Sequence, residues 1–415
     1  MALPSVKVTI NFSTGASFGQ AFLIGSGVFG QDVLADSAAT IVDVSSQVQS
    51  INTVRGRNLL TEQFQTGTAT VVLADATGTY NPQNTASPYY GLLLPLRKIQ
   101  IAATDPTTGL TYNMFSGYIT SYNYQQSQYV GQVNTTTITA QDATQLLTLA
   151  TVSTVTGAVA GEKTGTRFGR ILDQIGWPTS LRDVDTGLTS VQANPTTART
   201  AVSALAQLAL TEFGAFYIDK DGAVVFQDRL YTESSIGGTP TAFVDSGVGI
   251  QYFNAEFKLD DSQIFNEANV TAGAITATYK DTASVNTFFL HTYDAPTLLM
   301  DTAAEADNWA RAMVASRKDT TIRCDSITLN LNTANYAAGV TAALTLDYFS
   351  PITVTQTQPG SSSITKTLQV FGIAHSINYG NSSWFTRLTT AEPIIDSMII
   401  GNSQYGILGT NVLSY

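Results

Sequence analysis

Cysteine and histidine are nearly absent from this 415-residue chain, and their scarcity excludes two kinds of chemistry. The single cysteine, Cys324, cannot form a disulfide within the chain and is expected to be a small buried side chain. The two histidines, His291 and His375, stand alone in strand-like stretches far apart in the sequence. Without carboxylates, these three residues cannot make an ordinary zinc site. We therefore expect no metal, no cofactor and no histidine-centred catalysis.

Charged residues are also scarce, at 12% of the chain, which is about half the usual share. The 31 acidic residues outnumber the 20 basic ones, so the net charge is −11, and no run of lysine or arginine occurs. Tight nucleic-acid binding needs such basic runs and is not expected. The low charge fits either a monomer with an uncharged surface or a chain whose surface is buried against other subunits.

Long apolar runs are missing as well. No stretch approaches the roughly 20 apolar residues of a membrane helix, so we expect no membrane segment. Met1-Ala2-Leu3-Pro4 leads directly into alternating residues, so we expect no signal peptide and synthesis in a cytoplasm. The chain is 43% hydrophobic, which is enough for folded domains with real cores.

Alternating apolar and polar residues predict short β-strands through residues 1–149. Val6, Val8 and Ile10 begin this pattern, and a Gly- and Phe-rich loop at 18–30 follows without the spacing of a phosphate-binding loop. Further strands are expected at 41–44, 48–54, 68–73, 97–102, 112–124 and 132–140. Many short strands separated by turns are typical of an antiparallel barrel or sandwich.

Residues 150–235 form a small α+β module, after a short helix or turn at 142–149. Thr166 is placed to cap a helix that Gly176 ends, and Thr197 precedes a second apolar stripe at helical spacing. Asp219-Lys220-Asp221-Gly222 then joins two apolar strands as a hairpin turn.

Residues 236–392 return to strands, with one helix at about 303–316. Strands are expected at 248–259, 266–272, 276–280, 326–331, 341–348, 352–357, 367–377 and 384–390. The tail, 393–415, is apolar and either packs on its own domain or threads onto a neighbour. The expected fold class is thus mainly β: a first β-barrel domain (1–149), the module (150–235), a second β-barrel domain (236–392) and the tail.

Several acidic pairs are of the residue type that binds calcium or cleaves glycosides. Asp219-Lys220-Asp221-Gly222 resembles part of a calcium loop, but Val224 and Leu230 stand where that loop needs glycine and glutamate. Asp260-Asp261 and Asp183 with Asp185 are turn-like carboxylate pairs of the kind that glycosidases use. Such pairs arise by chance among 31 carboxylates, so we name no catalytic residue and expect no enzyme.

Two groups of residues are candidate contacts between subunits. Ser87-Pro88-Tyr89-Tyr90-Gly91 is a rigid aromatic turn, which either tucks against its own barrel or meets another subunit. Arg55 and Arg57 are a basic pair in an acidic chain, suited either to surface ion pairs or to an interface or lumen. The candidate inter-subunit contacts are therefore Arg55, Arg57, Pro88, Tyr89 and Tyr90.

A series of short motifs resembles, in its order, the minor tail or baseplate tail-hub proteins of long-tailed (siphovirus-type) phages. The motifs are Val54-Arg55-Gly56-Arg57, Tyr80-Asn81-Pro82, Ser87-Pro88-Tyr89-Tyr90-Gly91, Phe115-Ser116-Gly117, Gly176-Trp177-Pro178, Gly214-Ala215-Phe216-Tyr217-Ile218-Asp219, Ile264-Phe265-Asn266, Trp309-Ala310 and Ser383-Trp384-Phe385. The resemblance covers roughly residues 5–392. Val285-Asn286 departs from it, since the family has a Tyr-Gly pair there.

The resemblance implies a structural hub at the tail tip of a virion. Such hubs are homotrimers whose chains each contribute two tube-like barrels, so that a pseudo-six-fold ring lines the DNA channel. The implied partners are the distal tail protein or tail tube, the tape-measure protein, a central fibre or spike, and DNA in transient passage. The family implies no catalytic residue and no cofactor. The alternatives are a receptor- or carbohydrate-binding tail module and, less favoured, a cell-wall-degrading tail enzyme.

Overall fold

The computed structural model describes residues 4–12, 40–57, 63–126, 133–234, 238–332, 336–360 and 362–392. The loop expected at 18–30 and the tail at 393–415 lie outside these residues. None of the helices in the described ranges is both long and apolar enough to cross a membrane.

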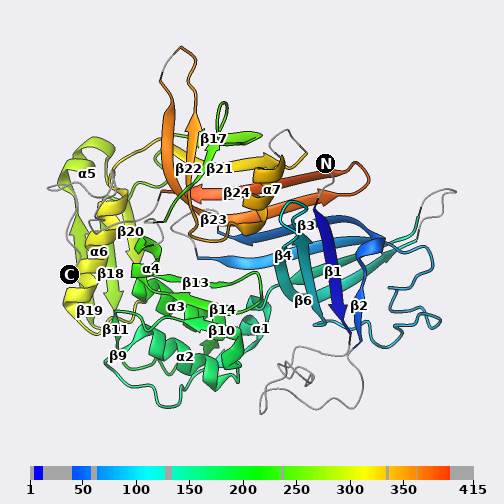
Figure 1. Ribbon diagram of the computed structural model, residues 1–415. Helices are drawn as coiled ribbons and strands as arrows, with labels where there is room; N and C mark the ends of the chain where they lie inside the picture. The colour runs from blue at the N-terminus through cyan, green and yellow to red at the C-terminus, as the bar shows by residue number, and fades with distance from the viewer. Residues whose placement is uncertain are drawn as a thin grey trace.

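One sheet of 14 strands contains most of the β structure and draws on both ends of the described chain (Figure 1). Its early strands are β1 (Ser5–Asn11), β2 (Ile41–Asp43), β3 (Val48–Gly56), β4 (Gln65–Ala74), β5 (Lys98–Thr104), β6 (Thr111–Gln125) and β7 (Thr135–Gln141). Its late strands are β15 (Thr241–Val244), β16 (Ile250–Gln251), β17 (Asn254–Lys258), β21 (Arg323–Asn330), β22 (Pro351–Gln356), β23 (Ile364–Asn378) and β24 (Ser383–Ala391). The mainly β fold class is confirmed.

Antiparallel pairing of β3 with β23 joins the early strands to the late ones. The register runs from Gly56 opposite Gly372 to Ser50 opposite Asn378. A single apolar core accordingly includes side chains from both groups, such as Ile51 and Trp384. The strand order is an open path from β16 to β2, so the described strands do not close into a barrel. The two tube-like barrels stay a prediction.

Alternation explains why these segments are strands. In β1, Val6, Val8 and Ile10 are buried while Ser5 and Lys7 are exposed, as a period of two residues requires when one face meets a core. The same pattern recurs in β4 and β7, where every second side chain is buried. Local sequence therefore encodes each strand, although it does not encode the strand's partner.

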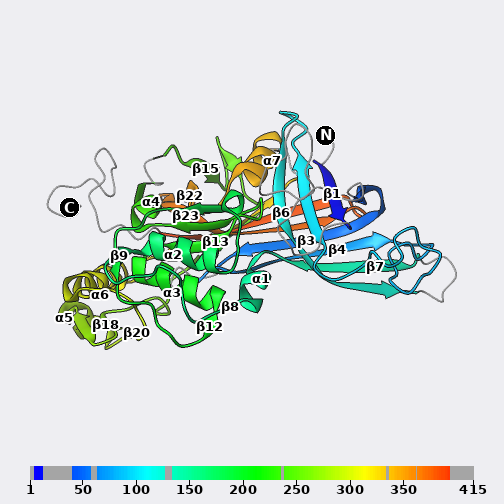
Figure 2. The same cartoon turned by 90° about the horizontal axis from the view of Figure 1, so that it is seen from below.

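The strand expected at 341–348 is wrong, because helix α7 (Tyr336–Thr345) occupies most of that range. Its alanines favour a helix, and an apolar run of this length does not distinguish a buried helix from a strand. Val340, Ala343 and Leu344 are buried at helical spacing, in the same core as the large sheet. Figure 2 shows α7 on one side of β3, β4 and β23, with helices α2 and α3 on the other.

Residues 150–235, where the α+β module is expected, contain a three-stranded sheet of β10 (Arg182–Val184), β14 (Val224–Gln227) and β13 (Ala215–Ile218). The larger helices there are α2 (Thr164–Gln174) and α3 (Ala201–Glu212), and the core includes Phe168, Leu205 and Phe226. The shorter elements in and just before the module are α1 (Thr144–Leu149), β8 (Thr151–Val152), β9 (Glu162–Lys163), β11 (Ser190–Val191), β12 (Arg199–Thr200) and α4 (Arg229–Ser234), with a 3-10 turn at Thr179–Leu181. A second 3-10 turn, Ser45–Gln47, lies between β2 and β3.

Both expected helix caps in the module are displaced by a few residues. Lys163 precedes α2, and Thr166 lies inside it. Thr200, three residues beyond Thr197, caps α3 by accepting a hydrogen bond from the Ser203 amide. The hydroxyl of Thr164, the first residue of α2, donates to Glu212 at 2.6 Å, a partner 48 residues away that no local pattern reveals.

A third unit packs within residues 236–392. Strands β18 (Glu267–Ala272), β19 (Ile275–Lys280) and β20 (Thr292–Ala295) form a separate sheet against helix α6 (Ala303–Arg317), with a core of its own. The helix expected at about 303–316 is thus confirmed. Helix α5 (Thr282–Phe288), capped by Asp281, was not expected. Trp309 Nε1 donates to the Leu210 carbonyl at 2.9 Å and so connects this unit to the module.

Candidate functional site

Four segments of the chain meet at one polar and aromatic contact, which we name the junction cluster. Its members come from the β3–β4 region, the hairpin of the module, the segment between α7 and β22, and β23 itself. They are Arg55, Arg57, Phe64, Tyr217, Lys220, Asp347, Tyr348, Phe349 and Phe371. Two of the five candidate contact residues, Arg55 and Arg57, belong to it.

Arg55 is buried inside the single chain, with 6% of the residue exposed. Its Nη2 donates to Asp347 Oδ1 at 3.2 Å, and its guanidinium lies 5.1 Å from the centre of the Tyr348 ring. Lys220 Nζ reaches the other oxygen of Asp347 at 3.5 Å. The carboxylate of Asp347 therefore joins cations from two other segments, and Arg55 has an intramolecular role. Its part in contacts between subunits stays a prediction, since that concerns a second chain.

Arg57 lies between two aromatic rings. Its guanidinium is 4.7 Å from the centre of the Phe64 ring and 4.4 Å from that of Phe371, which are cation–π distances. The Phe64 ring in turn contacts Tyr217 and Tyr348, at 5.1 and 4.9 Å between ring centres. These rings fix the end of β3 and the middle of β23 against the module hairpin.

In the aromatic turn 87–91, one tyrosine packs on the chain and the other is exposed to solvent. The Tyr89 ring stacks on Phe12 at 4.9 Å and on Tyr80 at 5.8 Å, so it packs on its own domain. Pro88 is exposed, and 54% of Tyr90 is exposed. From the sequence, this turn either packs on its own domain or meets another subunit. In the structure Tyr89 packs on its own domain, whereas Pro88 and Tyr90 are exposed, where another subunit could contact them.

Two buried titratable groups lie close to the junction cluster. Asp142 accepts from the amides of Gly67 at 2.6 Å and Thr144 at 2.9 Å, yet burial raises its pKa to about 6. His375 is 5% exposed and contacts Thr386 Oγ1 through Nδ1 at 3.0 Å. Burial and, to a smaller extent, the Arg55 charge lower the pKa of His375 to about 3.

These two groups give pH effects of opposite sign. As the pH falls from about 6 to about 4, the unfolded chain protonates His375 while the folded chain does not, so stability falls. Over the same range the folded chain protonates Asp142 first, so that group adds stability as the pH falls. We expect His375→Gln to reduce the loss of unfolding free energy over this range by roughly 1–2 kcal/mol and Asp142→Asn to increase it. Urea denaturation across this pH range checks the prediction, and equal slopes for both variants would contradict it.

The acidic side chains singled out in the sequence lie in loops and turns, except Asp183, which lies in strand β10. Asp219 Oδ1 accepts from the amides of Asp221 at 2.9 Å and Ala223 at 2.7 Å, which is the hairpin turn expected there. Asp185 accepts from the Asp228 amide at 3.0 Å, and Asp260 accepts from the Ser262 amide at 3.1 Å. Across the described ranges, no group of three or more metal-ligating side chains comes together.

Sequence reasoning missed a buried ionic centre in the module. Glu212 is fully buried, and its carboxylate accepts from Thr164 Oγ1, from the Thr189 amide at 2.9 Å and from the Leu188 amide at 3.0 Å. Arg167 is likewise fully buried and donates to the carbonyls of Val159 at 2.9 Å and Gln192 at 3.1 Å. Glu162 also pairs with Arg167, and Arg229 lies 3.8 Å from Glu212, so backbone groups and side chains together satisfy both charges. No spacing in the sequence signals this.

No protein-family model matches the sequence, and no curated protein sequence is significantly similar to it. Solved structures do match. The tail protein from Neisseria meningitidis MC58 has a TM-score of 0.55 at 13% identity, over 94% of this chain and 96% of that chain. The 43 kDa tail protein of prophage MuSo2 from Shewanella oneidensis has a TM-score of 0.57 at 12% identity, over 94% and 99%. Prophage tail protein gp18 from Listeria monocytogenes EGD-e follows, with a TM-score of 0.47 at 10% identity, over 92% and 94%.

The first two matches extend over nearly the whole of each chain, so this chain shares their fold. The resemblance expected from the sequence is confirmed at that level.

Proposed function

We propose that this chain, which has the fold of phage tail proteins, is a structural hub at the tail tip of a virion. Three copies form a pseudo-six-fold ring that joins the tail tube or distal tail protein to a central fibre or spike and surrounds the DNA channel. The observation that carries the proposal is the nearly full-length match to two tail proteins. The proposed location is the tail tip, after synthesis in the host cytoplasm, and no catalysis is part of the role.

The architecture supports a structural role in an assembly. Pairing of β3 with β23 makes one sheet from the two ends of the described chain, and the junction cluster fixes that sheet to the module. Strands β2, β16 and β17 of the sheet each pair with a single neighbour among the described strands. An edge strand offers unpaired backbone groups to another chain. Ring closure between copies through such edges would supply the tube-like barrels expected from the sequence.

A trimer is the measurable consequence of the proposal. We expect light scattering coupled to size exclusion, or native mass spectrometry, to give about three times the chain mass of 44.1 kDa. Tyr90→Ala should weaken the trimer, since large exposed aromatic rings often carry interface energy. Leu110→Ala, at an equally exposed apolar residue on another loop, is the matched control.

Purified tail particles provide a second test of the hub proposal. A chain that stays monomeric at every concentration and is absent from purified tails by mass spectrometry would sink the hub proposal. A map of the assembled tail tip also tests the proposed channel. Neutral or acidic side chains should face the lumen, because a strongly basic wall would bind the passing DNA. The tape-measure protein is the proposed occupant of that lumen before ejection.

A receptor- or carbohydrate-binding module is the second candidate, favoured by exposed aromatic rings at Tyr90, Phe253 and Phe289. Aromatic surfaces of this kind contact sugars and proteins. Binding of the isolated protein to host cells or to a glycan array, abolished by Phe289→Ala, would support it.

A wall-degrading enzyme is the third candidate, and an absence of glycan release from host cell walls would remove it.

A further inference from the structure

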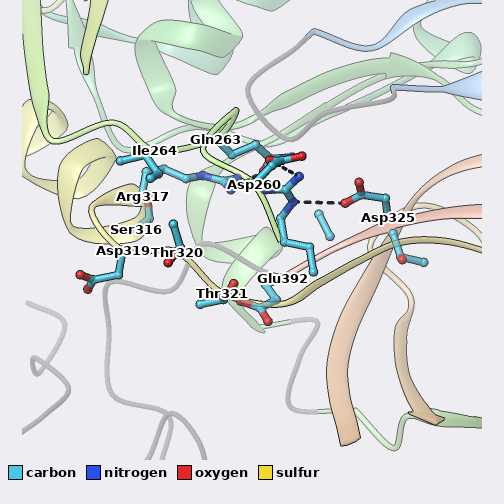
Figure 3. Close-up of a pocket in the computed structure, with 13 residues that line it drawn as sticks. Asp260, Gln263, Ile264, Ser316, Arg317, Asp319, Thr320, Thr321, Asp325 and Glu392 are labelled. Carbon is cyan, nitrogen blue, oxygen red and sulfur yellow. Dashed lines mark hydrogen bonds and ion pairs between the residues drawn. The ribbon is translucent and has the colours of Figure 1, made fainter. Parts of the chain in front are cut away.

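A polar pocket of about 80 Å³ lies at the end of α6, where the unit of β18–β20 meets β21 and β24 of the large sheet (Figure 3). The lining residues that matter here are Asp260, Gln263, Arg317, Asp319, Arg323 and Glu392. A single water occupies roughly 10–15 Å³ on this scale, so the pocket has room for a group of several heavy atoms.

Arg317, the last residue of α6, is 9% exposed and carries unmet hydrogen-bonding capacity. Its Nη1 donates to Gln263 Oε1 at 2.7 Å. Its Nε and Nη2 are buried and have no acceptor among the described residues, and none of the ion pairs found there includes Arg317. A buried guanidinium whose only hydrogen-bond partner is neutral is costly, because the Glu392 charge offsets only a small part of its desolvation.

The other charges of the pocket already have partners. Arg323 pairs with Asp260 at 2.8 Å and with Asp325 at 3.2 Å. Glu392 pairs with Lys366 Nζ at 2.7 Å. Figure 3 shows the Arg317 side chain extending toward Gln263 and Asp260, whereas the carboxylate of Asp319 points away from it. The buried nitrogens of Arg317 are therefore the hydrogen-bond donors beside this pocket that still lack an acceptor among the described residues.

We propose that this pocket binds one carboxylate group, held side-on by Nε and Nη2 of Arg317. These two nitrogens form one edge of the planar guanidinium, and a carboxylate matches such an edge with two parallel hydrogen bonds. The carboxylates of Asp260, Asp325 and Glu392 around the pocket oppose a more highly charged anion such as phosphate. Burial and the nearby Arg323 charge lower the pKa of Arg317 to about 10, so the guanidinium remains charged at neutral pH.

Thermal unfolding of the full chain in rising sodium acetate tests this, with sodium chloride holding the ionic strength constant. A ligand that binds only the folded state raises the melting temperature by mass action. We expect acetate to raise it for the native chain and not for Arg317→Met. Arg311→Met is the matched control: Arg311 lies on the same helix, is exposed and pairs with Asp307, so its variant should respond as the native chain does.

Arg317→Lys is the second variant, and it keeps the charge while removing the side-on edge. We expect it to bind acetate at least roughly tenfold more weakly than the native chain, because an ammonium cannot reproduce the paired geometry. The proposal is overturned if acetate does not stabilise the native chain beyond chloride. It is equally overturned if Arg317→Met and Arg317→Lys keep the full acetate response.

The carboxylate has two possible sources, a free small carboxylate or an acidic side chain of a second copy of this chain, and sedimentation velocity distinguishes them. A second copy as the source predicts that both excess acetate and Arg317→Met dissociate the oligomer. A free carboxylate predicts the same oligomer for the native chain and for Arg317→Met, with the acetate response confined to the native chain. This outcome is independent of the hub proposal, since acetate binding requires no tail.

Discussion

Asp347→Asn is expected to lower the free energy of unfolding by about 3 kcal/mol, although it replaces one atom of a partly exposed side chain. The side chain of Arg55 is 5% exposed and that of Asp347 is 29% exposed, so the larger desolvation cost falls on the arginine. Asparagine keeps the shape of aspartate but removes the charge that offsets this cost. Arg55 would then remain buried and charged with a neutral partner, which is the costly state.

A double-mutant cycle separates this charge effect from lost packing. Arg55→Met removes the cation and keeps an unbranched side chain, so we expect a smaller cost of about 1–2 kcal/mol. Adding Asp347→Asn to Arg55→Met should cost little more, because no buried charge is left without its partner. Asp307→Asn, in the exposed pair with Arg311, is the control and should stay within about 0.5 kcal/mol. Additive costs of the two junction changes, measured in urea, would contradict the interpretation.

Gly56→Ala is expected to cost at least about 4 kcal/mol or to prevent folding, which is the largest effect of a single methyl group predicted here. Gly56 has a φ of +113°, where side chains other than hydrogen are strained. A Cβ atom there would lie 2.3 Å from the Phe371 carbonyl oxygen and 2.4 Å from Gly372 Cα. Both contacts are with backbone, so a rotamer change cannot relieve them, and the β3–β23 pairing would have to open.

Two other glycines provide graded controls for Gly56→Ala. Gly372 lies opposite Gly56, but a Cβ there would meet its nearest atoms at 3.2 Å, and most of these belong to the Thr389 side chain. Gly109 has a φ of +72° and open space around it. We expect Gly109→Ala to cost about 1 kcal/mol from backbone strain alone, and Gly372→Ala to cost less than Gly56→Ala. If Gly56→Ala denatures with the same midpoint as Gly109→Ala, the close approach is not what limits this position.

Part of the candidate site could be predicted from the sequence. The aromatic turn and the Arg-Gly-Arg segment stand out by residue type, and both lie where the chain makes dense contacts. The contacts of these side chains could not be predicted from the sequence, because Asp347, the partner of Arg55, is 292 positions away. The Arg317 pocket was hidden for a related reason. Its lining comes from the segment before β18, the end of α6, the start of β21 and the end of β24, and these residues form no local motif.

The sequence by itself determined the local conformation of most segments. Alternation produced strands such as β1, and Asp221-Gly222 produced the module hairpin, because side-chain direction and turn geometry depend on neighbours a few residues away. The near absence of cysteine and histidine likewise limited the available chemistry before any fold was known.

Only the tertiary structure decided how these segments combine. It paired β3 with β23, buried Arg55 against Asp347 and made a helix of the apolar run at 336–345. It also separated the unit of β18–β20 and α6 from the large sheet, although both share the same strand pattern. The physical reason is that a strand's alternation specifies which face is apolar but not which edge it joins. Partner choice depends on packing between distant segments, and that free energy has no local signature.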